Sequence, residues 1–242
     1  MAKEKVARKK LLKEPDEFIT TSARMMAFLR RYSRWAAGLG VLLVLVGLGV
    51  WGWRQYQERR ERQGMELQAQ AHQVYRNAME QTDETAKKEL MAKAVDRFQK
   101  VIQQYQGTMA SWMARIYRGH ACYALGRYEE AIHDYESAMA KAPSRDSEGM
   151  KALALQGLGY AWMAKGDLDK AMTCFQGLKE SGGTTFQRTA QWNIARCYER
   201  QGKNREALEV YKEIERSFPA GYFGYLAKAK VMELSEKGEG AP

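Results

Sequence analysis

The longest apolar stretch of the chain runs from Trp35 to Trp53 and contains no charged residue. Arg34 and Arg54 close it on either side. A helix over this stretch would be roughly 28 Å long, which matches the hydrocarbon core of a bilayer, and tryptophans at its ends favour the headgroup level. A core helix of a soluble protein would show polar positions on one side, and none occurs here. The pattern therefore predicts a transmembrane helix over residues 35–53.

A cleaved signal peptide is the main alternative for this stretch. The basic region ahead of the apolar run has 34 residues, which is long for a signal peptide. No small-x-small cleavage site follows Trp53, because the chain continues directly into RQYQERRERQ. We therefore expect an uncleaved signal anchor.

The flanking charges predict the orientation of this anchor. Residues 1–34 hold ten Lys and Arg against four acidic residues. On the other side, only four arginines lie within about 15 residues, namely Arg54, Arg59, Arg60 and Arg62. Because positively charged flanks stay in the cytoplasm, we expect a cytoplasmic N-terminus and a C-terminal domain across the membrane. The four arginines weaken the asymmetry, so the inverted orientation stays open.

Two short segments border the apolar stretch. Residues 1–34 are predicted to form a basic cytoplasmic tail that ends in an amphipathic juxtamembrane helix and binds anionic lipid. Residues 54–65 are polar and contain no proline, which predicts a helical linker with Gly64 as its break. The net charge of +10 comes largely from the tail, and no basic stripe with interleaved aromatics follows. Nucleic acid is therefore not an expected partner.

Residues 66–236 show an internal repeat of helical patterns. Four alanines recur at spacings of 37, 40 and 36 residues, and each is followed four residues later by an aromatic residue. The pairs are Ala94 and Phe98, Ala131 and Tyr135, Ala171 and Phe175, and Ala207 and Tyr211. A glycine precedes each of the last three pairs (Gly126, Gly166 and Gly202) and is expected to end a helix with positive φ.

This pattern resembles the tetratricopeptide repeat, a helix-turn-helix unit in which small residues lie where two helices meet. The resemblance implies an all-α fold, with a single transmembrane helix followed by a solenoid of about four helix pairs. It also implies packing roles for six small residues, which are Gly119, Ala131, Gly159, Ala171, Ala195 and Ala207.

The segment 221–234 is predicted to be a capping helix that closes the solenoid. Its apolar positions Tyr222, Tyr225, Leu226, Ala229 and Met232 are expected to cover the last repeat. Residues 237–242 are predicted to be a flexible tail.

No pattern of catalytic or metal-binding residues stands out. The three histidines (His72, His120 and His133) have no metal-ligand spacing with a cysteine or carboxylate. The cysteines Cys122, Cys174 and Cys197 lack CxxC spacing and are expected to be core thiols, although one pair could oxidise outside the cytoplasm. We therefore expect no enzyme activity, no metal, no cofactor and no small-molecule substrate.

The remaining function class is protein binding in the groove lined by the first helix of each pair. The candidate groove residues are His120, Tyr123, Tyr160, Met163, Trp192, Arg196 and Glu199. The layout of anchor and repeats resembles the ancillary subunit of the bacterial protein-export translocon. This resemblance implies an inner-membrane protein with a periplasmic domain, and translocon subunits, chaperones or exported clients as partners. A structural subunit of a dedicated secretion, polysaccharide or motility complex is the alternative.

Overall fold

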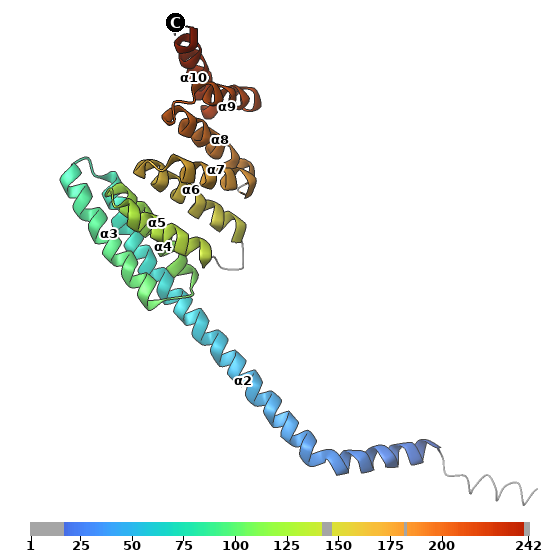
Figure 1. Cartoon of the computed structure of the whole chain (residues 1–242). Coiled ribbons are helices and arrows are strands. Elements are labelled where there is room, and N and C mark those ends of the chain that lie inside the picture. Colours follow the sequence, from blue (N-terminus) through green and yellow to red (C-terminus); the bar gives the residue numbers. More distant parts are fainter. Residues whose placement is uncertain (1–16, 142–146, 182, 240–242) are drawn as a thin grey trace, which may run out of the picture. The chain divides into compact units, whose positions relative to one another are not determined.

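The computed structural model describes residues 17–141, 147–181 and 183–239, and within these ranges every regular element is an α-helix. The helices are α2 (Glu17–Glu80), α3 (Glu84–Gln104), α4 (Met109–Ala124), α5 (Tyr128–Ala140), α6 (Ser147–Lys165), α7 (Leu168–Ser181), α8 (Gly183–Arg200), α9 (Asn204–Ser217) and α10 (Tyr222–Glu239) (Figure 1). The predicted all-α class, one long apolar helix followed by a helix-turn-helix solenoid, is confirmed. Residues 1–16 of the predicted N-terminal tail and residues 240–242 of the predicted flexible tail 237–242 lie outside the described residues, whereas residues 237–239 of that tail are helical and belong to α10.

The chain divides into two compact units, Met1–Glu58 and Arg59–Pro242. In the first unit, α2 carries the predicted transmembrane stretch. The large apolar side chains between Leu39 and Trp53 are each at least half exposed. A continuous apolar surface of this kind is unfavourable in water. Among the described residues, α2 is the one helix that is long and apolar enough to cross a membrane, which is consistent with a single-pass anchor.

In the second unit, helices pack in chain order. Each of the helices α3 to α9 contacts the next one in the chain. In addition, α4 contacts α6, α6 contacts α8, and α8 contacts α10. Residues of α2 beyond Arg59 complete the first pair, because Ala71 shares a hydrophobic cluster with Phe98 of α3 and Ala114 of α4. The pairs α4/α5, α6/α7 and α8/α9 follow. The first helices of successive pairs therefore form a common surface.

Glycine ends the first helix of each of these three pairs. Gly126, Gly166 and Gly202 have φ of 75°, 93° and 75°, which confirms the predicted left-handed turns. After α4, the amide of Arg127 donates to the carbonyl of Cys122 at 2.8 Å, which satisfies an end carbonyl of the helix.

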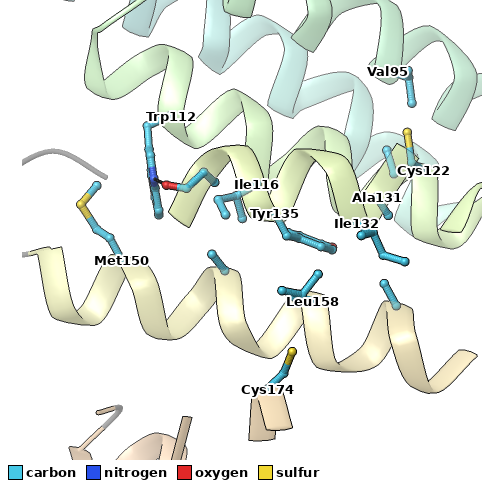
Figure 2. Packing of buried hydrophobic residues seen from close by; sticks show 14 of the residues in the cluster. Val95, Trp112, Ile116, Cys122, Ala131, Ile132, Tyr135, Met150, Leu158 and Cys174 are labelled. Atoms are coloured by element: carbon cyan, nitrogen blue, oxygen red, sulfur yellow. Dashed lines mark hydrogen bonds between the residues drawn. The ribbon is translucent and has the colours of Figure 1, made fainter. Parts of the chain in front are cut away.

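The repeated alanine and aromatic positions lie at the centre of each pair. Ala131, Ala171 and Ala207 are completely buried. Figure 2 shows Tyr135 pointing from α5 towards α6, beside Leu158. The ring of Tyr135 occupies the space that a Cβ atom at Gly119 would need, and the ring of Phe175 does the same at Gly159. The small residues thus let the aromatic rings enter between helices.

The expected helix break at Gly64 is wrong, because α2 continues unbroken to Glu80. Gly64 is buried, and a Cβ atom there would lie 3.0 Å from the Cβ atom of Ala110. The glycine therefore permits close approach of α2 to the α3–α4 turn. Glu61 holds the same turn, since its carboxylate accepts hydrogen bonds from the amides of Met109 and Ala110, each at 3.1 Å.

The predicted apolar face of the last helix is also wrong. Tyr222, Tyr225 and Met232 are 74%, 69% and 59% exposed, and Ala229 is exposed as well. The residues of α10 that pack on the last repeat are Phe223, Ala227, Val231 and Leu234. Gly224 explains the rotation of the helix, because a Cβ atom there would lie 2.0 Å from the carbonyl oxygen of Phe218. This close approach turns the Phe223 side of α10 towards α9.

Candidate functional site

The second unit contains a cavity of about 410 Å³ between the first helices of three successive pairs. Its lining comes from α2 (Tyr75 and Met79), α4 (His120, Tyr123 and Ala124), α5 (Tyr135) and α6 (Gln156, Gly157 and Tyr160). We call it the aromatic pocket. Its exposed lining is mostly apolar, because the rings of four tyrosines and one histidine form most of the wall.

The local sequence explains why the wall is aromatic. Gly157 lets α6 approach α5 so closely that a Cβ atom at this position would lie 2.5 Å from the ring of Tyr135. His120 packs against the same ring at a centroid distance of 5.6 Å. The hydroxyl of Tyr160 accepts a hydrogen bond from the side-chain amide of Asn193 at 3.1 Å. The rings are therefore held in place by packing and by a contact from α8.

The aromatic pocket carries no charged lining residue at neutral pH. Its lining holds no Lys, Arg, Asp or Glu. Burial lowers the pKa of His120 to about 4, so that its imidazole is neutral at neutral pH. Burial also raises the pKa of Tyr75, Tyr123 and Tyr135, so that these hydroxyls stay protonated.

Two arginines of α8 lie near one side of the pocket. The positive charges of Arg196 and Arg200 act on the Tyr123 hydroxyl and partly oppose the rise of its pKa caused by burial. Arg196 donates to the amide oxygen of Asn193 at 3.2 Å, and Arg200 donates to the carbonyl of Met163 at 2.6 Å. Both guanidinium groups are thus positioned by neutral acceptors.

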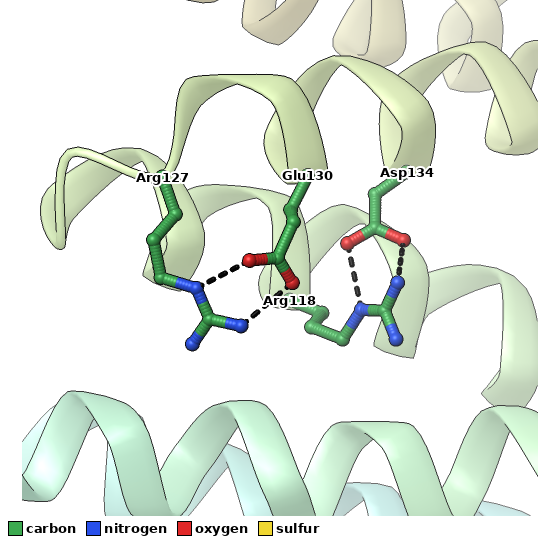
Figure 3. Close-up of polar contacts among 4 residues, drawn as sticks. All are labelled: Arg118, Arg127, Glu130 and Asp134. Atoms are coloured by element: carbon green, nitrogen blue, oxygen red, sulfur yellow. Dashed lines mark hydrogen bonds and ion pairs between the residues drawn. The ribbon is translucent and has the colours of Figure 1, made fainter.

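Charged groups elsewhere on α4 and α5 are paired with each other (Figure 3). Arg118 makes two hydrogen bonds to the buried carboxylate of Asp134, with Nε at 2.7 Å from Oδ2. Arg127 binds Glu130 in the same bidentate way on the surface. The Arg118–Asp134 pair joins α4 to α5, whereas Arg127 and Glu130 are three residues apart at the start of α5, and none of the four residues lines the pocket.

The structure brings three of the seven candidate groove residues together, because His120, Tyr123 and Tyr160 all line the aromatic pocket. Arg196 lies beside the pocket, because it donates to Asn193, which itself donates to the hydroxyl of Tyr160. The other three, Met163, Trp192 and Glu199, make contacts outside the pocket.

Met163, Trp192 and Glu199 lie away from the pocket. Met163 is 4% exposed and belongs to a hydrophobic cluster. Trp192 packs against the ring of Tyr211 at 5.1 Å. Glu199 accepts a hydrogen bond from Tyr211 at 2.6 Å and pairs with Lys230 at 2.9 Å. The contacts of Trp192 and Glu199 join α8 to α9 and α10.

Sequence reasoning assigned Tyr135 only to packing and missed five lining residues, namely Tyr75, Met79, Ala124, Gln156 and Gly157. A signal for Tyr75 was present, because Ala71 precedes it by four residues just as Gly119 precedes Tyr123. Gly157 carried no such signal, since its role depends on how closely α6 approaches α5.

The described residues offer no group of three or more histidine, cysteine, aspartate or glutamate side chains that could hold a metal ion. Cys122, Cys174 and Cys197 are free and buried, and burial raises the pKa of each thiol to about 11. Such thiols are poor nucleophiles.

The fold is similar to that of two crystal structures of nearly identical TPR-like repeats from Podosopora anserina. Each has 14% identity and a TM-score of 0.59, and the match covers 75% of this chain and 89% of that chain. A crystal structure of BtubC from P. vanneervenii matches at 13% identity and a TM-score of 0.42, over 77% of this chain and 93% of that one. At 14% identity, the likeness to the two Podosopora anserina structures shows the fold alone. No curated protein matches the sequence.

A family model described as a tetratricopeptide repeat-like domain matches residues 28–213, which is most of the chain. The matched range contains every residue of the aromatic pocket. The chain belongs to the tetratricopeptide repeat-like domain family.

Proposed function

We propose that the protein is a membrane-anchored scaffold that binds protein partners at the aromatic pocket. The observation that carries this proposal is the convergence of His120, Tyr123 and Tyr160 around one open cavity of about 410 Å³. Aromatic side chains supply large contact areas and are enriched at the centres of interfaces. Repeat folds present such surfaces along the first helices of successive pairs.

The apolar stretch and the charges beside it support a proposed cellular location for the protein. The exposed apolar stretch 35–53 would keep the repeats at a bacterial inner membrane. The excess of basic residues before it supports a cytoplasmic N-terminus, in contact with anionic lipid, and periplasmic repeats. We propose that the scaffold assists protein export or envelope protein assembly, with translocon subunits, chaperones or exported proteins as partners.

Site-specific photo-crosslinking in native membranes tests this function. One photoreactive residue replaces Tyr123, which is 38% exposed at the pocket. A matched control replaces Lys93, which is exposed on α3 outside the pocket. We expect translocon subunits and a range of exported proteins to be captured from position 123 and not from position 93.

Other outcomes would overturn the proposal. One protein captured at a constant ratio would indicate a structural subunit of a dedicated complex. Capture of cytosolic proteins alone would show that the orientation is inverted. Equal capture from both positions would show that partners do not bind at the pocket.

A further inference from the structure

The aromatic pocket has a chemistry that selects among protein partners. Its lining is uncharged and mostly aromatic, so a charged group that entered it would lose its hydration without gaining an opposite charge. A bulky apolar side chain loses no such interaction and gains burial. The lining thus favours an aromatic or large aliphatic side chain over a carboxylate or an ammonium group.

The surroundings of the pocket have the opposite character. Arg196 on α8 donates to the side-chain amide of Asn193, which in turn donates to the hydroxyl of Tyr160 in the pocket lining. Arg200, one turn further along α8, donates to the carbonyl of Met163 on α6. Both of these hydrogen bonds go to neutral acceptors, and neither arginine forms an ion pair within the part of the chain that the structure describes. The nearest acidic residue in sequence, Glu199, is already held by Lys230 and Tyr211. The α8 side of the pocket therefore presents uncompensated positive charge.

The two features lie on different helix pairs. The pocket is built by α2, α4, α5 and α6, and the arginines belong to α8. An occupant that uses both features must extend from one repeat to the next. A polypeptide segment meets this requirement, because adjacent side chains in a chain can fill the pocket and reach α8 together.

Resting on the proposed function, we infer that the aromatic pocket binds a partner polypeptide through one bulky uncharged side chain, with acidic residues beside it that face Arg196 and Arg200. The apolar side chain supplies most of the affinity. The acidic residues supply orientation and a salt-dependent contribution.

Three labelled synthetic peptides test this inference by fluorescence anisotropy with the full-length protein in detergent. They share a Gly/Ser framework and carry Trp followed by two Asp, Ala followed by two Asp, or Trp followed by two Lys. We expect the first peptide to bind best. Loss of the ring should weaken binding by about tenfold or more, and reversal of the flanking charge by about twofold to fivefold.

Two variants of the protein locate the binding. Ala124→Trp places a large ring at an exposed lining position and should abolish binding of the first peptide. Lys93→Trp adds the same ring outside the pocket and should leave binding unchanged. The double charge reversal Arg196→Glu and Arg200→Glu should make the Lys-flanked peptide the better ligand, a change of preference that a general loss of structure does not produce.

Absent or equal binding of the three peptides, or an Ala124→Trp protein that binds normally, would overturn the inference. If partners were still crosslinked specifically from position 123, the scaffold function would stand with another recognition chemistry. If that crosslinking also failed, the proposed function would fail with it.

Discussion

At the scale of single residues, the contact of Tyr135 with two glycines joins three helices. Its ring lies where a Cβ atom at Gly119 would be, with a distance of 2.7 Å, and where one at Gly157 would be, with a distance of 2.5 Å. Gly119 belongs to α4 and Gly157 to α6, so the ring of α5 fills the space between two successive pairs. The same ring forms part of the aromatic pocket. Both the packing of the helices and the shape of the candidate site thus depend on the absence of a Cβ atom at Gly119 and Gly157.

Replacing Gly157 with alanine should destabilise the protein, although alanine favours helices. The added methyl group meets the Tyr135 ring, and such overpacking costs about 1–3 kcal/mol. The matched control is Gly177→Ala in α7, where a Cβ atom would lie 3.7 Å from Leu155 in ordinary contact. This control should stabilise by about 0.5–1 kcal/mol.

Urea unfolding of the full-length protein in detergent, followed by circular dichroism, measures both changes in the free energy of unfolding. A stabilising Gly157→Ala substitution would show that Tyr135 moves aside freely, and would remove the argument that this glycine shapes the pocket.

At the scale of elements, α10 carries two apolar stripes, and only one is used within the chain. Phe223, Ala227, Val231 and Leu234 pack on the last repeat. Tyr222, Tyr225 and Met232 lie on the exposed side. Hydrophobic periodicity is the same for both stripes, so spacing alone does not distinguish them. The contact of Gly224 with Phe218 selects between them.

Two substitutions in α10, two residues apart, test which side of the helix packs on the last repeat. Leu234 is 5% exposed, so Leu234→Ala should destabilise by about 2–3 kcal/mol. Met232 is 59% exposed, so Met232→Ala should change stability by no more than about 0.5 kcal/mol. Thermal unfolding of the full-length variants gives the comparison, and the reverse order would restore the face expected from the sequence.

At the scale of the whole molecule, the chain joins an exposed apolar helix to a packed repeat unit. The first unit has large apolar side chains on its surface, whereas the second buries four hydrophobic clusters. Exposure to water is unfavourable for the apolar surface of the first unit, whereas the second unit has its apolar clusters buried. The proposed lipid environment for residues 35–53 would remove this conflict, and the proposed orientation follows from the flanking charges.

Cysteine labelling tests that orientation. The native thiols are buried with a raised pKa, so they should react slowly with a membrane-impermeant maleimide. In cells with a permeabilised outer membrane and an intact inner membrane, Lys93→Cys should be labelled and Arg24→Cys should not. Labelling of Arg24→Cys alone would show the inverted orientation.

Local patterns were enough to predict the elements and their class. The uncharged stretch 35–53, the Ala-aromatic repeat and the turn glycines each depend on interactions within a few residues, and the helices and turns follow them. The same patterns indicated three of the pocket residues, His120, Tyr123 and Tyr160, because each lies on the first helix of a repeat.

Rotation and approach of the helices were decided by tertiary contacts alone. Gly64 was expected to break a helix and instead admits Ala110, and Gly224 turns α10 away from the expected face. Met163 carries the same periodic signal as Tyr123 but lies in the core. A sequence specifies which side chains can share a helix face by their spacing. Whether that face meets another helix, a cavity or solvent depends on residues distant in the chain, which only the packed structure brings together.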